Sequence, residues 1–203
     1  MVSEATLEQT EAGLVSVGPG WFVLNAREAR WNRREGRGHS LNFTGSTDEE
    51  AETHFRQLGV NLFVLGPGEP IGMYHWEADQ EDFLVLSGEA LLIVEGQERP
   101  LRQWDFVHCP AETRHIVVGA GDGPCAVLAM GGRAHIDENC NGGGYTVDEV
   151  ALRHGAGSRR RRATRSSPTP ASRTRSRRAI ATAGSRASRR NARRRRRRPP
   201  GRR

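Results

Sequence analysis

The stretch from Gly72 to Gly88 reads GMYHWEADQEDFLVLSG and decides the fold of this chain. His75 and Glu77 lie two residues apart in a run with strand character, so their side chains leave the same face of a pleated strand. Glu81 begins an apolar strand after a short polar turn, and a hairpin there returns Glu81 toward the first pair. The stretch therefore predicts one imidazole and two carboxylates that point at one place.

A second stretch, DFVHCPAETRH from Asp105 to His115, ends in another histidine. His115 stands at the head of an apolar run that predicts a further strand, so its imidazole can reach the same place from a neighbouring strand. Taken singly, each of these polar residues is typical of a solvated face, and the interpretation rests on their joint spacing. The candidate metal ligands are His75, Glu77, Glu81 and His115.

The first stretch resembles the first motif of the cupin superfamily. That motif runs His-x-His, three or four residues, Glu, six residues and Gly. His75, Glu77, Glu81 and Gly88 match its spacing, with Glu77 in the place of the second histidine.

The second stretch resembles the second cupin motif, which runs Gly, five residues and Pro-x-Gly-x-x-His. Pro110 and His115 match this spacing. The chain departs from the motif at two glycine positions, where it has Trp104 and Glu112. Two motifs at a consistent separation are more specific than either motif alone.

The resemblance covers roughly residues 58–132 and implies an all-β fold, the cupin double-stranded β-helix or jelly-roll barrel. It also implies a divalent metal held inside the barrel. Cupins with these motifs include isomerases, dioxygenases and decarboxylases, so the fold does not select a reaction.

Strand signals outside the motifs agree with a barrel. Short apolar runs are separated by turns that carry Gly or Pro, and no helical periodicity intervenes, which is typical of sandwiches and barrels. The predicted strands span residues 59–65, 71–77, 81–87, 90–95, 104–109, 114–119 and 124–130.

The strands are apolar on both faces. On the face of the candidate ligands, the predicted pocket wall consists of Met73, Phe83, Trp104 and His108. The opposite face also carries large apolar residues, and a strand that is apolar on both faces must be covered on both. We expect a second copy of the chain in a homodimer to supply this cover, and residues 13–45 are the alternative.

Two imidazoles and two carboxylates form a mixed nitrogen and oxygen donor set, which suits manganese, iron, zinc, cobalt or nickel. Four protein ligands leave one or two positions for water or substrate, so a bound metal can act as a Lewis acid. The expected function is that of a metal-dependent enzyme acting on a small molecule. The alternative is a non-catalytic module that binds a sugar or another small ligand, with Glu77 and Glu112 making hydrogen bonds in place of metal bonds.

The charge of the chain is divided between two segments. Residues 1–157 hold 11 arginines and all 24 acidic residues, whereas residues 158–203 hold 20 arginines and no acidic residue. The net charge of +7 therefore describes neither segment. We predict a flexible segment at 1–12, a cupin domain with an N-terminal extension at 13–157, and a disordered basic tail at 158–203.

Two interpretations of the arginine-rich tail stay open. It is either a basic arm that binds nucleic acid without sequence preference, or a frameshifted translation product of a GC-rich gene. Arginine is the basic residue throughout, without any lysine, which indicates codon bias.

The remaining sequence features concern where in the cell the protein is located. The first 18 residues carry acidic residues where a signal peptide needs positive charge, and no apolar run is long enough to cross a membrane. Three cysteines without Cys-x-x-Cys spacing argue against a disulfide framework. These features predict a cytoplasmic protein.

Overall fold

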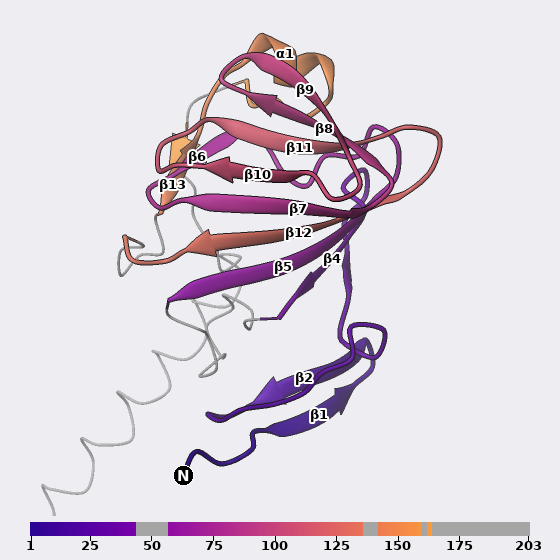
Figure 1. The fold of residues 1–203 in the computed structure, drawn as a ribbon, viewed down its shortest axis with the longest axis vertical. Coiled ribbons are helices and arrows are strands. Elements are labelled where there is room, and N and C mark those ends of the chain that lie inside the picture. The colour runs from indigo at the N-terminus through magenta and orange to yellow at the C-terminus, as the bar shows by residue number, and fades with distance from the viewer. Residues whose placement is uncertain (44–56, 136–141, 160–161, 164–203) are drawn as a thin grey trace, which may run out of the picture. The chain divides into compact units, whose positions relative to one another are not determined.

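The computed structural model describes residues 1–43, 57–135, 142–159 and 162–163, and its described part is built almost entirely from β-strands (Figure 1). Two six-stranded sheets form the double-stranded β-helix that the sequence predicts. In spatial order, the first sheet contains β10 (Phe106–Cys109), β7 (Glu81–Ser87), β12 (Cys125–Gly132), β5 (Leu58–Leu65), β4 (His39–Asn42) and β3 (Asn32–Arg33). The second contains β14 (Arg162–Ala163), β13 (Gly143–Tyr145), β6 (His75–Glu77), β11 (His115–Ala120), β8 (Glu89–Val94) and β9 (Gln97–Arg102).

The principal core lies between these two sheets. Alternate residues of β7 and β12 face β8 and β11, because successive side chains of a strand point to opposite faces. The fully buried side chains Phe83, Val85 and Val127 come from the first sheet, and Val117 comes from the second. These contacts hold the two sheets face to face.

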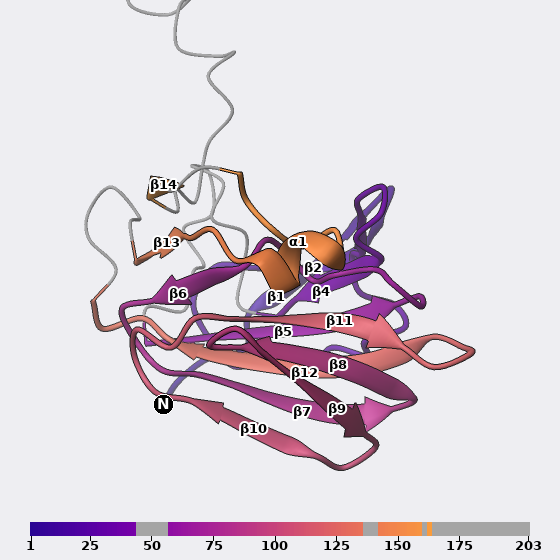
Figure 2. The same ribbon diagram turned by 90° about the horizontal axis from the view of Figure 1, so that it is seen from above.

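A second core covers the outer face of the second sheet. Ile116 and Val118 of β11 pack there against Ala151 and Ala156, which belong to α1 (Glu149–Arg153) and to the turn that follows it (Figure 2). Asp148 caps this helix by accepting a hydrogen bond from the backbone N–H of Ala151 at 2.8 Å. Residues 148–156 therefore supply cover on this face of β11 that the sequence does not predict.

On the first sheet, Phe106 of β10 stays 59% exposed. The homodimer remains a prediction.

Two strand predictions need correction. The predicted strand at 71–77 is regular only over β6, at residues 75–77. The polar run at 97–102, which the sequence does not mark as a strand, forms β9 at the edge of the second sheet. An edge strand needs only one hydrogen-bonded side, so its polar side chains and Pro100 are tolerated.

Both ends of the described chain are more structured than the sequence predicts. Residues 1–12 contain β1 (Thr6–Thr10), which pairs along its length with β2 (Gly13–Val17), so a hairpin stands where we predict a flexible segment. At the other end Ser158 is buried and β14 pairs with β13, so order extends past the predicted boundary at residue 157. Residues 164–203 lie outside the described residues, and so do the predictions made for them.

The part of the chain that the structure describes contains no helix long and apolar enough to span a membrane.

Three motif positions adopt a left-handed backbone. Gly88, the last residue of the first motif, has φ +73°, and a Cβ there would lie 2.7 Å from the carbonyl oxygen of Pro124. Trp104 and Glu112, which replace the two glycines of the second motif, have φ of 74° and 68°. Glycine adopts this conformation without steric cost. Both departures from the motif therefore place strained residues where the backbone favours glycine.

Substitution of Gly88 by alanine should lower the free energy of unfolding by at least about 2 kcal/mol, because left-handed strain is combined with a backbone clash. The matched control is Gly123→Ala, since a Cβ at Gly123 meets nothing within 4 Å. The control should change stability by less than about 0.5 kcal/mol in denaturant titration. Equal effects of the two substitutions would contradict this account of the motif glycine.

Substitution of Glu112 by glycine should instead raise stability by about 0.5–1 kcal/mol, which is the left-handed strain minus the backbone entropy of glycine. Glu112→Ala keeps the strain and should give no gain. Denaturation midpoints of the two variants provide the measurement, and a gain that alanine reproduces would point to the lost charge in place of the backbone.

Candidate metal centre

Three polar side chains converge between the sheets, each from the first residue of a strand. His75 begins β6 and His115 begins β11, and these two residues are direct partners in the second sheet. Glu81 begins β7 in the facing sheet. The ligand atoms of His75, Glu81 and His115 all lie within 4.8 Å of one another, so the group can hold a metal ion.

The histidines are oriented by backbone carbonyls. Nδ1 of His75 lies 2.8 Å from the carbonyl oxygen of Met73, and Nδ1 of His115 lies 2.9 Å from that of Thr113. A ring that donates its Nδ1–H to a carbonyl presents Nε2 on its other side. A hydrogen bond of this kind at the nitrogen that does not bind the metal is typical of metal-binding histidines. Both Nε2 atoms face Glu81, with Nε2–Oε2 distances of 3.7 Å for His75 and 2.9 Å for His115.

Burial and ion pairing act against each other in this cluster. Burial lowers the pKa of His75, but its interactions with the carboxylates of Glu77 and Glu81 outweigh burial and raise the pKa to about 9. For His115, burial is likewise outweighed by interactions with Cys109 and Glu81, which raise the pKa to about 10. Burial raises the pKa of Glu81, yet the two imidazoles lower it to about 2. Without a metal, the cluster is therefore ionised at neutral pH.

The centre has an apolar and sulfur-containing wall. The ring of Phe83 packs edge-on against His115 at a centroid distance of 5.3 Å. Cys109 is the cross-strand partner of Glu81, and its buried thiol interacts with His115. The local sequence pattern does not reveal this contact of Cys109, because it does not show the pairing of β10 with β7. This wall leaves the centre shielded from water on the side of His115, whose side chain is 1% exposed.

Glu77 lies beside the centre, more open to solvent than the other three residues. Its Oε1 is 3.6 Å from Nε2 of His75, and its side chain is 35% exposed. Gly131 leaves room next to it, since a Cβ there would lie 3.5 Å from Oε2 of Glu77 and 3.8 Å from Cγ of Glu81. A larger residue at position 131 would project toward the centre, so the absence of a side chain keeps this side open.

Two predicted pocket residues do not line the centre. Trp104 is 68% exposed in the loop before β10. His108 alternates with the inward-facing Val107 and Cys109, so it points outward and bonds to Asp82 at 2.6 Å. The sequence misplaces both because it does not show where β10 begins or which of its faces is inner. Phe83 does line the centre, and the described contact of Met73 is its carbonyl bond to His75.

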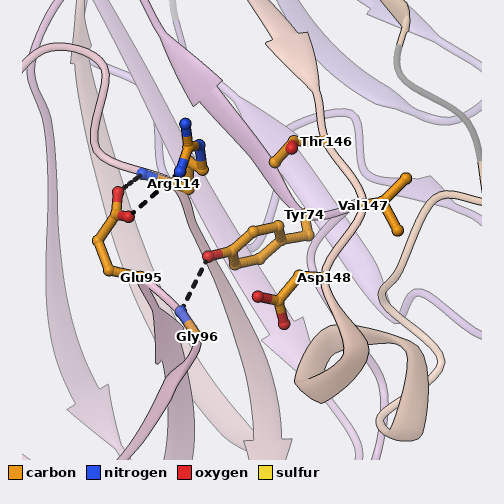
Figure 3. A pocket seen from close by; sticks show the side chains of 7 residues that line it. All are labelled: Tyr74, Glu95, Gly96, Arg114, Thr146, Val147 and Asp148. Atoms are coloured by element: carbon orange, nitrogen blue, oxygen red, sulfur yellow. Dashed lines mark hydrogen bonds and ion pairs between the residues drawn. The ribbon is translucent and has the colours of Figure 1, made fainter.

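Tyr74 precedes His75 in the chain and lies on the outer side of the second sheet, away from the centre. Its side chain points to the opposite face of β6 from His75 and is buried in the second core. Its hydroxyl accepts a hydrogen bond of 3.3 Å from the backbone N–H of Gly96, beside a polar cavity of about 210 Å³ (Figure 3). The cavity therefore lies behind β6, on the other side from the candidate metal ligands.

Comparison with protein families identifies a cupin domain in the chain. Residues 61–131 match the cupin domain family, and this segment holds all four candidate ligands. No curated protein matches the chain.

Several solved structures are similar to the chain. A sugar phosphate isomerase of Silicibacter pomeroyi, described as a cupin superfamily member, is 25% identical over 68% of this chain and 82% of its own, with a TM-score of 0.42. A DMSP lyase of Ruegeria pomeroyi is 21% identical over 54% and 58% of the two chains, with a TM-score of 0.43. A cupin protein of Bacteroides fragilis is 20% identical over 41% and 72%, with a TM-score of 0.37.

The ionised cluster predicts how metal-free stability changes with pH. The folded pKa values of about 9 and 10 for His75 and His115 exceed the ordinary value of 6.5, so the folded state binds more protons than the unfolded state in this range. The two protonated imidazoles make their full contribution to the free energy of unfolding below pH 6.5, and this contribution is lost as the pH rises toward 10. Urea unfolding of the metal-free protein at several pH values should show this decline.

The control for this prediction is Glu81→Gln, which removes the charge that holds both imidazoles protonated. In that variant the decline above pH 6.5 should be smaller than in the wild type. A decline of the same size in both proteins would assign it to groups outside the centre.

Proposed function

Since the domain at residues 61–131 belongs to the cupin superfamily, we propose that its His75–Glu81–His115 centre binds a divalent transition metal and that the domain is a metal-dependent enzyme acting on a small molecule. The observation that carries this proposal is the orientation of the two histidines. Each has its Nδ1 on a backbone carbonyl, and each directs Nε2 toward the same carboxylate.

A purely structural ion cluster explains this arrangement less well. The rings of His75 and His115 lie 5.0 Å apart, and both carry a proton at neutral pH when no metal is bound. Two adjacent buried cations repel each other, and a structural role does not require both of them. A metal ion replaces both protons and uses the same Nε2 atoms, so the geometry favours coordination.

The donors define the class of metal. Two imidazole nitrogens and one or two carboxylates suit manganese, iron, zinc, cobalt or nickel. Glu77 is the proposed fourth ligand, because it is the carboxylate beside His75. A bound metal of this kind supplies Lewis acidity toward a carbonyl, hydroxyl or water oxygen.

The side chains around the centre have separate proposed roles. His75, Glu81 and His115 hold the ion, and Phe83 excludes water from the side of His115. Glu77 stands at the more open side, where its carboxylate either completes the coordination or accepts a proton from a ligand. Isomerase, dioxygenase and decarboxylase reactions are all compatible with this set, and we propose no choice among them.

The second candidate function is a non-catalytic small-ligand module. It is favoured by one observation, that the hydrogen bonds of His115 are complete without a metal, through Thr113 and Glu81. Stoichiometric metal in the purified protein would favour the enzyme over the non-catalytic module. The predictions of a homodimer, of a cytoplasmic location and of nucleic-acid binding by the tail remain predictions.

Replacement of either His75 or His115 by alanine should weaken metal binding by more than about 100-fold, because the loss of a ligand exceeds the 10- to 100-fold cost of losing a ligand's supporting partner. His108→Ala is the matched control, since this exposed histidine points away from the centre and should leave metal binding unchanged. Metal content after dialysis and calorimetric titration with Mn²⁺ or Zn²⁺ provide the measurements. Unchanged metal content in both ligand variants would refute the proposed site.

A further inference from the structure

The cavity of about 210 Å³ on the outer side of the second sheet is lined by groups that the metal centre does not use (Figure 3). Three parts of the chain enclose it: Tyr74 before β6, the turn between β8 and β9, and the loop between β13 and α1. Pockets for drug-sized ligands measure about 300–1,000 Å³, so this cavity suits a smaller molecule.

The turn between β8 and β9 forms one wall of the cavity. Its two residues, Glu95 and Gly96, have φ of 47° and 73°, which is the pattern of a two-residue type I′ hairpin. Such turns favour Asn, Asp or Gly at the first position, so Glu95 holds a strained backbone there. Its backbone N–H donates to the carbonyl of Arg114 at 2.9 Å, and its Oε1 accepts from the backbone N–H of Arg114 at 2.7 Å. These two bonds fix the wall before any ligand arrives.

Asp148 forms the opposite wall. Its Oδ1 accepts the capping bond from the backbone N–H of Ala151 at 2.8 Å, which holds the carboxylate in place. Its Oδ2 faces Gly96, since a Cβ on that glycine would lie 3.6 Å from it. An ionised carboxylate has about four acceptor positions, and the capping bond uses one of them. Asp148 therefore presents further acceptor positions to the cavity.

Two hydroxyl groups line the cavity together with this carboxylate. The hydroxyl of Tyr74 also reaches Gly96, whose backbone N–H it accepts at 3.3 Å, so it lies near Oδ2 of Asp148 (Figure 3). Thr146 supplies the second hydroxyl, and its backbone N–H donates to the carbonyl of Tyr74 at 3.2 Å. The cavity is thus lined by oxygen atoms of three side chains that the fold holds in place.

The charges around the cavity favour a cation. The lining residues include two carboxylates, of Glu95 and Asp148, and one guanidinium, of Arg114. Nη1 of Arg114 lies 3.6 Å from Oε2 of Glu95, and both side chains are about half exposed, so this pair is accessible to solvent. Glu95 is balanced by Arg114, and the charge of Asp148 leaves the lining with a net charge of −1. An anion would be repelled by this charge, and a cation would neutralise it.

We propose that this cavity binds the protonated primary amine of a small molecule, with the ammonium group on Asp148, Tyr74 and Thr146. An ammonium group has three N–H donors and no acceptor, which matches the three oxygen-bearing side chains. The amine belongs either to a simple alkylamine or to an α-amino acid whose carboxylate reaches the remaining donors of Arg114. The site requires no metal and is separate from the proposed metal centre.

The test compares the full-length wild type with Asp148→Asn and with the control Glu11→Gln. Asparagine keeps the shape of the side chain and caps a helix as well as aspartate does, so the variant removes only the charge. Glu11 is exposed in the turn between β1 and β2, and its replacement removes the same charge away from the cavity. Ligand-observed NMR titrations at neutral pH and constant ionic strength measure the affinity for ethanolamine and for glycine. Ethylene glycol is the neutral analogue, in which a hydroxyl replaces the ammonium group.

The wild type and Glu11→Gln should bind at least one of the two amines, and ethylene glycol should bind more weakly. Asp148→Asn should weaken amine binding by at least about 10-fold, because hydrogen bonds between charged groups are about twice as strong as neutral ones. Tyr74→Phe keeps the aromatic ring in the second core and removes one acceptor, so it should weaken binding by about 3- to 10-fold. Tighter binding of glycine than of ethanolamine would identify the ligand as an amino acid, and the reverse order would identify a simple amine.

Three outcomes would overturn the inference. The first is that neither amine binds to the wild type. The second is an affinity of Asp148→Asn equal to that of the wild type, which would place the bound amine elsewhere on the acidic domain. The third is equal affinity for ethylene glycol and ethanolamine, which would make the cavity a site for neutral hydroxyl compounds.

Discussion

The contact on which the centre depends is the 2.9 Å bond between Glu81 Oε2 and His115 Nε2. Glu81 belongs to the first sheet and His115 to the second, so this bond crosses the interior of the barrel. A buried carboxylate and a buried imidazole are each unfavourable alone, because each loses the water that solvates its charge. The two sheets must therefore meet at a fixed separation here, and the apolar contacts of Phe83 and Val117 set that separation beside it.

Much of this arrangement could be predicted from spacing alone. His75, Glu81 and His115 are placed by strand alternation and by one hairpin, which are local properties that a sequence displays. Phe83 follows from the same rule, since it lies two residues after Glu81 on the same face of β7. The apolar runs and the turn residues between them predict a sandwich or barrel, and the resemblance to cupins implies that it is a jelly roll.

The rest depends on contacts that no local pattern records. Ala151 and Ala156 pack on the outer face of the second sheet from a segment distant in the sequence, and such long-range packing leaves no local pattern. Trp104 is predicted in the pocket wall, but it is exposed in the loop before β10, where its backbone is left-handed.

The electrostatics of the centre bear on how the proposed metal would fit the buried cluster. Without metal at neutral pH, His75 and His115 each hold an extra proton, and Glu81 is ionised. A divalent ion that displaces these two protons brings two positive charges and removes two, so the total charge of the buried cluster is unchanged. The neighbouring carboxylates then experience the same net charge with and without the metal ion. The exchange of protons for metal therefore requires no rearrangement of the surrounding apolar wall.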